Sequence, residues 1–178
     1  MDCPNKTKLT DSLLIGDKRL LHFIYTTIRC RILNLLMPYI TNLGGARFII
    51  ATSLIIFTLV DRRLGSEVIA ALAASHLVVQ IIKRIANRPR PYIALQYIKE
   101  FKIPFEPYSF PSGHTTAIFS LVVTLNFYLP AFSLILILLA ALVGISRVYL
   151  GVHYPSDVLM GGLLGSCFAY LIHINFFI

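Results

Sequence analysis

The fold is decided by residues 111–157, which read PSGHTTAIFSLVVTLNFYLPAFSLILILLAALVGISRVYLGVHYPSD. Two apolar runs in this stretch, 112–129 and 131–148, meet at a turn that contains a proline. Each run has about 18 residues, or ~27 Å of helix at ~1.5 Å per residue, close to the ~30 Å hydrocarbon core of a bilayer. The stretch therefore predicts a membrane-spanning hairpin. Because a hairpin returns to the face on which it began, we expect Ser112 and Arg147 at the same membrane face.

Three further apolar runs complete a predicted bundle of about five spanning helices. Residues 46–60 and 65–84 precede the hairpin, and a last span begins near residue 156 and continues to the C-terminus. Four prolines in the polar loop 85–110 exclude a long helix there. Residues 1–45 are basic and only patchily apolar, which predicts an interfacial or re-entrant helical segment.

The composition of the chain indicates a membrane protein. Hydrophobic residues make up 57% of the 178 residues and charged residues only 13%, whereas soluble domains carry about 25% charged residues. We therefore predict an all-α, integral-membrane helical bundle that forms a single domain over residues 1–178, with the spanning part in 46–178. We expect a multi-pass protein of the plasma membrane. Cys3, Cys30 and Cys167 have no paired spacing, so neither a disulfide framework nor a thiolate metal site is predicted.

The net charge of +8 does not indicate a nucleic-acid partner. The basic residues are confined to segments between apolar runs, where lipid head groups and phosphate ligands explain them better. Fourteen of the sixteen Lys and Arg residues, all except Arg62 and Arg63, fall on the face that carries Ser112 and Arg147 under this topology. The positive-inside rule therefore favours a cytoplasmic position for that face.

Three polar clusters that are far apart in the sequence are expected to meet at this face. They are KRIANRPRP at residues 83–91, PSGH at residues 111–114 and SRVYLGVHYPSD at residues 146–157. The predicted catalytic loops are therefore 83–114 and 146–157.

The clusters contain the groups that phosphoryl transfer needs. Lys83, Arg90 and Arg147 can neutralise a phosphate, and each arginine offers a bidentate fork of donors. Residues 112–114 open a helix, so that free backbone N–H groups and the positive end of the helix dipole face an anion. Gly113 permits a close approach of the backbone to this anion.

His153 and Asp157 form a candidate nucleophile pair. Their spacing of four residues brings a carboxylate beside an imidazole if the chain turns helically. The carboxylate would then fix one ring nitrogen as a donor and leave the other free to attack phosphorus. His114 would be available to protonate the leaving oxygen as a general acid.

The three clusters together resemble a known family. Residues 83–91 match K-x6-R-P, residues 111–114 match P-S-G-H, and residues 146–157 match S-R-x5-H-x3-D. In this order they are similar to the three signatures of the type 2 phosphatidic acid phosphatase family, which includes bacterial membrane lipid phosphatases and is related to vanadium haloperoxidases. The resemblance covers roughly residues 30–178. It implies a helical bundle, hydrolysis of lipid phosphates or diphosphates without a metal or other cofactor, and a phosphohistidine intermediate.

The resemblance also implies a role for each motif residue. By motif position, His153 resembles the nucleophile, Asp157 its orienting partner and His114 the acid. The residues that resemble the phosphate pocket are Lys83, Arg90, Ser112, Gly113 and Arg147. The implied partner is a membrane lipid phosphate, such as phosphatidate, phosphatidylglycerophosphate or undecaprenyl diphosphate. Many members of the family act on the outer membrane face, so both orientations stay open.

Two alternative functions remain at this point. A lipid phosphotransferase would pass the phosphoryl group from His153 to an alcohol instead of water. A non-catalytic lipid-binding protein would use the basic cluster only to hold head groups. A transporter is less consistent with the sequence, which shows no inverted repeat.

Four residues outside the motifs are predicted to be structural or incidental. His76, within the second span, is predicted to be a hydrogen-bonded core residue. Gly161 and Gly165 form a small-xxx-small pair that predicts close helix packing. His173 is predicted to have no particular role.

Overall fold

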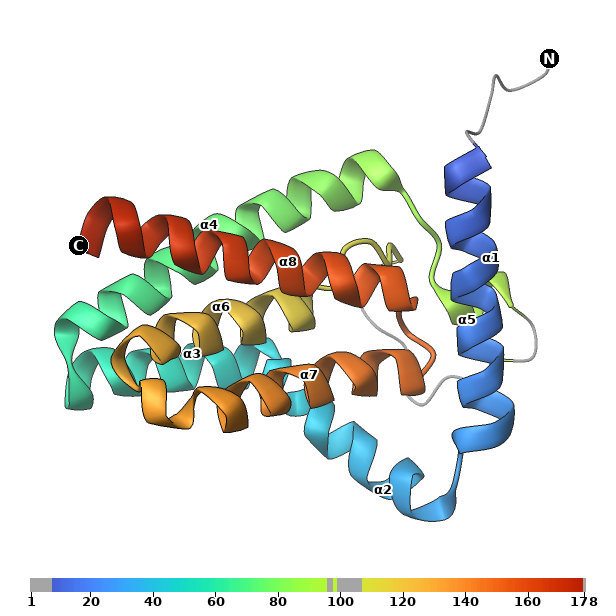
Figure 1. The fold of residues 1–178 in the computed structure, drawn as a ribbon, viewed down its shortest axis with the longest axis horizontal. Coiled ribbons are helices and arrows are strands. Elements are labelled where there is room, and N and C mark those ends of the chain that lie inside the picture. The colour runs from blue at the N-terminus through green and yellow to red at the C-terminus, as the bar shows by residue number, and fades with distance from the viewer. Residues whose placement is uncertain (1–7, 96–97, 99–106, 178) are drawn as a thin grey trace.

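Long helices run side by side through most of the chain in the computed structural model (Figure 1). The structure describes residues 8–95, 98 and 107–177; part of the predicted loop 85–110 therefore lies outside the described residues. The α-helices are α1 (Lys8–Phe23), α2 (Arg31–Ile40), α3 (Ala46–Ile55), α4 (Arg62–Ala86), α5 (Pro91–Ala94), α6 (Gly113–Tyr128), α7 (Ser133–Tyr149) and α8 (Pro155–Ile172). Short 3-10 or π-helical turns are η1 (Ile24–Ile28), η2 (Thr41–Gly44), η3 (Ile56–Val60), η4 (Pro130–Phe132) and η5 (His173–Phe177).

Five helices occupy the five predicted spans, namely α3 with η3, α4, α6, α7 and α8. Among the described residues, three segments are long and apolar enough to cross a membrane by themselves: Arg62–Ala86, Pro130–Tyr149 and Pro155–Asn175. Arg31–Gly44 and Ala46–Val60 form a bent pair with an angle of 49°, which makes a fourth span if the pair counts as one. The remaining helix, α6, has 16 residues, or about 24 Å. It packs against α8, α4, α7 and α3 and so lies inside the bundle.

The N-terminal segment has two parts with different directions. α1 lies crosswise at the end of the bundle where α4 ends and α8 begins (Figure 1). α2 contacts α7 and turns through η2 into α3, as the first half of the bent pair. The interfacial or re-entrant character of residues 1–45 stays a prediction, and residues 1–7 of this segment lie outside the described residues.

α4 and α6 run antiparallel in a fixed register. The hydroxyl oxygens of Ser75 and Ser120 lie 2.9 Å apart, and the Tyr128 hydroxyl donates to Glu67 at 2.7 Å. Positions 67 and 75 are eight residues apart on α4, as are positions 120 and 128 on α6. Both contacts therefore belong to the same antiparallel alignment of the two helices. The same register brings the start of α6 level with the last turn of α4, where Lys83 lies.

Glycines let α8 approach α6 closely. A Cβ atom on Gly161 would lie 2.7 Å from the carbonyl oxygen of Ser112, and one on Gly165 would lie 2.4 Å from that of Thr116. No side chain fits at such distances, so the predicted packing role of these two glycines is confirmed. The contact places the beginning of α8 directly against the beginning of α6.

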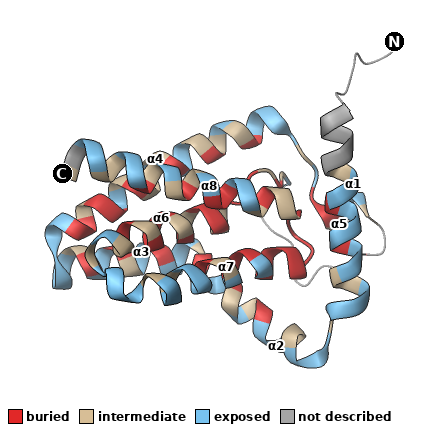
Figure 2. Ribbon diagram, viewed as in Figure 1, coloured by how far each residue is buried: buried red, intermediate tan, exposed pale blue. Residues whose placement is uncertain are grey.

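Many large apolar side chains lie on the outer surface of the bundle. Figure 2 shows buried residues where helices face one another and exposed residues along the outer sides. The outward side chains include Leu59, Leu134 and Leu163, which are 79%, 71% and 65% exposed. Exposed leucines of this kind are expected when the surrounding solvent is lipid. The protein is therefore a multi-pass membrane protein.

Candidate active site

The first cluster brings two cations into the protein at the end of α4. The C-cap residue Asn87 adopts a left-handed conformation with φ 45°, which asparagine tolerates, and its N–H donates to the Lys83 carbonyl at 3.1 Å. Pro89 and Pro91 then prevent a further helical turn through this link. Lys83 and Arg90 are 6% and 3% exposed, so both charges are held inside the structure.

Arg90 faces the predicted nucleophile. Its Nη1 donates to the carbonyl of Val152 at 3.1 Å and lies 3.3 Å from Nε2 of His153. The guanidinium is therefore placed beside the ring nitrogen that would attack phosphorus. A phosphate bound at this nitrogen would contact Arg90 as well.

The second cluster begins α6, as predicted. Ser112 is the N-cap, and its N–H donates to the Asp157 carbonyl at 3.0 Å, which joins the first turns of α6 and α8. Its side chain makes no capping hydrogen bond; it accepts one from the Thr115 hydroxyl at 2.9 Å instead. Gly113 and His114 follow and line a cavity. An added Cβ on Gly113 would meet nothing within 4 Å, so the helix N-terminus opens on free space.

The third cation lies in the last turn of α7. Arg147 is 7% exposed, and its Nη1 donates to the Thr41 hydroxyl at 2.8 Å. Its Nε is buried and has no hydrogen-bond partner among the described residues. A buried donor without a partner is costly, and a bound anion would satisfy it.

His153 and Asp157 are close together, but they do not form a short hydrogen bond. Nδ1 of His153 lies 3.5 Å from Oδ2 of Asp157. The same Oδ2 accepts the Tyr154 N–H at 2.8 Å, and Oδ1 accepts Arg88 Nη1 at 2.7 Å. Asp157 thus has firm partners other than the histidine, and His153 Nδ1 has no hydrogen-bond partner within the described parts of the chain.

The imidazole of His153 is kept neutral. Burial lowers the pKa of His153 well below its usual range, and the nearby charges of Arg147, Arg90 and Lys83 lower this pKa further. A neutral imidazole has a free lone pair on one nitrogen, which is the form that can attack phosphorus.

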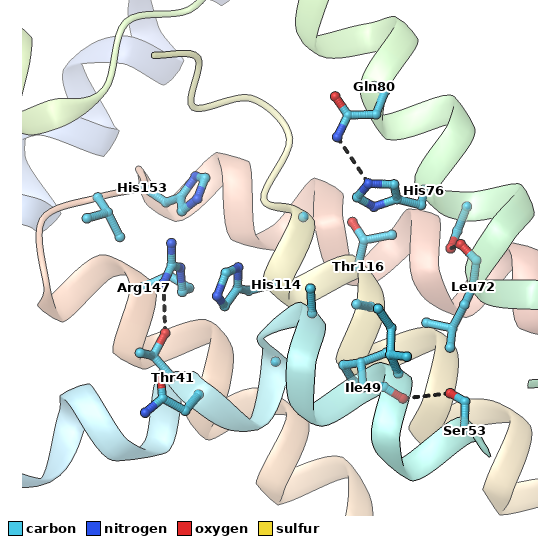
Figure 3. Close-up of a pocket in the computed structure, with 18 of the residues that line it drawn as sticks. Thr41, Ile49, Ser53, Leu72, His76, Gln80, His114, Thr116, Arg147 and His153 are labelled. Carbon is cyan, nitrogen blue, oxygen red and sulfur yellow. Dashed lines mark hydrogen bonds between the residues drawn. The ribbon is translucent and has the colours of Figure 1, made fainter. Parts of the chain in front are cut away.

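These residues surround one end of a cavity of about 1160 Å³. Figure 3 shows the side chains of His114, Arg147 and His153 gathered at this end. The cavity continues between α3 and α4, where it is lined mainly by apolar side chains, including Ile49, Leu54 and Leu72 from these helices. It therefore joins a cationic compartment to an apolar groove at the level of the membrane.

Six of the eight predicted site residues line this cavity: Lys83, Arg90, Gly113, His114, Arg147 and His153. The other two, Ser112 and Asp157, are fully buried behind the cavity wall. The structure thus brings the three clusters together, while it places Ser112 and Asp157 behind the residues that face a ligand.

Three residues outside the predicted set, Thr41, Arg88 and Asp17, lie next to the site. Thr41 holds Arg147, and Arg88 holds Asp157. Asp17, on α1, bonds to Arg88 Nη2 at 2.6 Å. Arg88 belongs to the first basic cluster, so its position in the sequence was a signal. Nothing in the basic N-terminal segment distinguished Asp17 or Thr41.

His76 differs from its prediction. It is hydrogen-bonded, as predicted, because its Nε2 lies 3.1 Å from Nε2 of Gln80. It is not a core residue, however, since it is exposed and lines the groove between α3 and α4. Neighbouring Ser75 takes the buried position on this part of α4 instead.

No group of three His, Cys, Asp or Glu side chains among the described residues is placed to hold a metal ion. The charge at the site comes from Lys83, Arg90 and Arg147. Whether the reaction needs a metal stays a prediction that a chelator can test.

Two histidines and three cations line one cavity of this helical bundle, and these are the groups that phosphoryl transfer would use. The model of the PAP2 superfamily matches residues 65–177. This match covers more than half of the chain, and the chain therefore belongs to the PAP2 superfamily. The family that the three motifs resemble is confirmed.

Relatives and solved structures agree with this assignment. An undecaprenyl-diphosphatase of Sulfolobus acidocaldarius is 34% identical over 143 residues, which cover 78% of this chain and 68% of the relative. A lipid A 1-phosphatase of Rhizobium johnstonii is 32% identical over 64% of this chain, which spans 48% of that relative. A phosphatidylglycerophosphatase B of Bacillus subtilis is 32% identical over 79% of this chain and 73% of its own length.

The crystal structure of Aquifex aeolicus LpxE superimposes with a TM-score of 0.81 at 27% identity, over 88% of this chain and 94% of that chain. A PAP2-type phosphatidylglycerolphosphate phosphatase from Bacillus subtilis has a TM-score of 0.75 at 27% identity, over 94% and 86%. The chain is an enzyme of this family of lipid phosphatases.

Proposed function

We propose that this enzyme hydrolyses the phosphate or diphosphate head group of a membrane lipid through a phosphohistidine at His153. The observation that carries the proposal is the position of His153 Nε2, 3.3 Å from Arg90 at the cationic end of a cavity that continues into an apolar groove. The phosphate would bind at the cationic end and the lipid tail would lie in the groove. We propose the plasma membrane as the location.

In the first step, Nε2 of His153 attacks phosphorus while the bond from phosphorus to the lipid oxygen breaks. His114, which takes up a proton when the anionic head group binds beside it, donates that proton to the lipid oxygen, so the lipid leaves as an alcohol or as a lipid monophosphate. Lys83, Arg90 and Arg147 stabilise the negative charge on the equatorial oxygens, together with the N-terminus of α6.

In the second step, water attacks the phosphorus of phosphohistidine. The now neutral His114 accepts a proton from this water, and the bond between phosphorus and Nε2 of His153 breaks. Inorganic phosphate leaves, and both histidines return to their initial states. Asp157 lies 3.5 Å from Nδ1 of His153 and would stabilise the positive charge of the ring during both steps.

The lipid substrate is proposed from the groove and from the relatives together. The relatives are named for undecaprenyl diphosphate, lipid A and phosphatidylglycerophosphate, so the head group is variable within this fold. Phosphatidate, phosphatidylglycerophosphate and undecaprenyl diphosphate are the candidates to compare first.

The test measures phosphate release by detergent-purified protein from these three lipids and from a soluble phosphomonoester, with His153→Asn as the blank. Radiolabelled substrate, quenched in alkali, should leave an acid-labile phosphate on the wild-type chain and none on His153→Asn. An added alcohol should not become phosphorylated. Release that continues in His153→Asn, or label that appears on the added alcohol, would contradict hydrolysis through phosphohistidine.

A further inference from the structure

The hydroxyl of Thr41 bonds to a distant side chain instead of to its own helix. A helical serine or threonine can satisfy its hydroxyl by donating to the carbonyl four residues earlier. Six residues of this protein do so: Thr26, Ser53, Thr58, Ser66, Thr116 and Thr124. Thr41 instead accepts a hydrogen bond from Arg147 Nη1 at 2.8 Å, across 106 positions of the sequence. The contact therefore depends on tertiary structure.

The bend between α2 and α3 brings Thr41 to the site. Thr41 is the first residue of η2, where the two halves of the bent pair meet at 49°. Gly44 ends this turn, and an added Cβ there would lie 2.9 Å from the His114 carbonyl oxygen and 2.7 Å from Cγ1 of Val143. The turn is thus packed against both α6 and α7. This packing fixes the Thr41 hydroxyl beside the cavity, where Figure 3 shows it bonded to Arg147.

Arg147 depends on this contact for its orientation. The arginine is 7% exposed, and within the described residues its guanidinium makes one hydrogen bond, to Thr41. No carboxylate in the described part of the chain forms an ion pair with it. Lys83 and Arg90 line the same cavity, and like charges repel the guanidinium. The Thr41 hydroxyl is therefore the group that holds Arg147 against this repulsion.

The contact also determines which edge of the guanidinium can bind a phosphate. The group has five N–H donors, one on Nε and two on each Nη. Thr41 accepts from Nη1, whereas Nε is buried and has no partner among the described side chains and backbone. The edge formed by Nε and Nη2 is thus left for the paired contact that arginine makes with phosphate oxygens.

We propose that Thr41 is a positioning residue for phosphoryl transfer, which holds Arg147 so that the edge formed by Nε and Nη2 faces the phosphoryl group. This inference rests on the proposed function and adds a residue of the N-terminal segment to the same site. The charge on the equatorial oxygens is greatest in the transition state, so the orientation of Arg147 matters most there. Loss of the hydroxyl should therefore change kcat more than KM.

Three substitutions test the hydroxyl. Thr41→Val removes it and keeps the branched shape, and should lower kcat by about 10-fold with KM within about 2-fold, because a hydrogen bond to a charged group is lost. Thr41→Ser retains the hydroxyl and should keep kcat within about 2-fold of the wild type. Thr58→Val makes the matched change at an exposed hydroxyl of η3, in the same bent pair, and should leave kcat unchanged.

A double-mutant cycle with Arg147→Met separates positioning from direct contact with the phosphate. If Thr41 acts through Arg147, Thr41→Val should cause no further loss once the arginine is replaced. Losses that multiply would show that the hydroxyl acts on the phosphate by itself, and they would overturn the positioning role. Wild-type kcat in Thr41→Val would overturn it as well, as would a Thr41→Ser variant that is as slow as Thr41→Val.

Vanadate binding tests the same contact without turnover, because five-coordinate vanadate imitates phosphorus in the transition state. Bound vanadate should raise the temperature of thermal unfolding in detergent. Thr41→Val should need about 10-fold more vanadate than the wild type for the same rise, and an equal requirement would overturn the inference. If the wild type releases phosphate from no lipid but this difference in vanadate binding is found, the proposed function fails and the positioning of Arg147 stands.

A second variant serves if Thr41→Val does not fold. Thr41→Ala removes the same hydroxyl without placing an apolar branch against the guanidinium. Its kcat and its vanadate affinity should each fall by at least about 3-fold, since a water molecule replaces only part of the lost hydrogen bond. A folded Thr41→Ala variant with wild-type kcat and wild-type vanadate affinity would overturn the inference.

Discussion

The two ends of the bundle each place a histidine beside a carboxylate, but with different partners. At the catalytic end, His153 Nδ1 lies 3.5 Å from Asp157. At the opposite end, His173 Nδ1 lies 2.8 Å from Glu67, which also accepts the Tyr128 hydroxyl at 2.7 Å. The shorter pair, His173 with Glu67, is not among the residues that line the cavity of the candidate active site. His173 therefore has a structural role, although the sequence had predicted none for it.

The two pairs differ in what surrounds the part of the imidazole that does not contact the carboxylate. His173 stacks on Phe127 with ring centres 3.9 Å apart, so the protein covers this ring. His153 instead has Nε2 beside Arg90 in a cavity lined by two more cations. A histidine–carboxylate pair alone joins helices; it becomes a candidate nucleophile when its other nitrogen faces a cationic space that can hold phosphate.

The largest loss of activity is expected when His153 is replaced by asparagine, and the same substitution at His173 is the control. His153→Asn should lower phosphate release by at least ~1000-fold, because no attacking nitrogen remains. His173→Asn should keep activity within about 2-fold, because it lies at the other end of the bundle. Initial rates on the preferred lipid measure both. Comparable losses of activity in the two variants would contradict the assignment of a catalytic role to His153 and a structural role to His173.

A second contrast uses one arginine from each end. Arg147→Met should lower kcat by roughly 100- to 1000-fold, since a buried cation near the developing phosphate charge is lost. Arg63→Met removes an exposed arginine that bonds to the Phe177 carbonyl at the far end and should change kcat by less than about 2-fold. Retention of wild-type kcat in Arg147→Met would remove this arginine from the phosphate pocket.

The acid role of His114 gives a third contrast along α6. His114→Ala should slow lipid hydrolysis by about 100-fold, because the alkoxide must leave without a proton. The loss should be much smaller for an alkylphenyl phosphate, whose phenolate leaves easily. Tyr128→Phe, on the same helix at the far end, should affect neither substrate. An equal loss on both leaving groups would argue for a binding role of His114 rather than proton donation.

The far end should matter for stability. Glu67→Gln weakens hydrogen bonds to Tyr128 and His173 and should lower the free energy of unfolding by about 1–3 kcal/mol. Thermal unfolding in detergent measures this change, while activity per folded molecule should stay the same. Combined with Tyr128→Phe, the loss should be less than additive because the two residues share one hydrogen bond. Unchanged thermal stability would contradict a structural role for the cluster.

The smallest expected effect is that of a chelator. The side-chain cations Lys83, Arg90 and Arg147 supply positive charge at the phosphate site. Incubation with EDTA should therefore leave the rate within error of the untreated enzyme, and added Mg²⁺ should not raise it. Strong inactivation that a divalent cation reverses would overturn the prediction of a metal-independent reaction.

Much of the fold was predictable because lipid imposes simple rules on a chain. Apolar runs of membrane length predicted the positions of α3, α4, α6, α7 and α8. Hydropathy alone could not predict that α6 is shorter than a span and enclosed by its neighbours, since a central helix and a lipid-facing helix have similar compositions. The crosswise direction of α1 also follows from tertiary contacts such as Asp17 with Ser156.

The site was predictable where residue type and spacing reflect chemistry. The hairpin brought Ser112 and Arg147 to one end, as its geometry required. Packing decided the rest: Ser112 is turned behind the cavity wall, and Thr41 reaches Arg147 from a segment 106 residues earlier. No local pattern records such a contact, because its two sides are adjacent only after folding.

The matched register of α4 and α6 limits how this enzyme can change in length. Ser75 is fixed against Ser120, so one extra residue between Ser75 and Lys83 would rotate Lys83 by ~100° and shift it ~1.5 Å along the helix. The cluster around Glu67 would be untouched, and the product would be a folded but inactive protein. Point substitutions on the lipid-facing side should be tolerated over the same interval. Along this part of α4, substitution of the lipid-facing residues is therefore compatible with activity, whereas insertion or deletion of a residue is not.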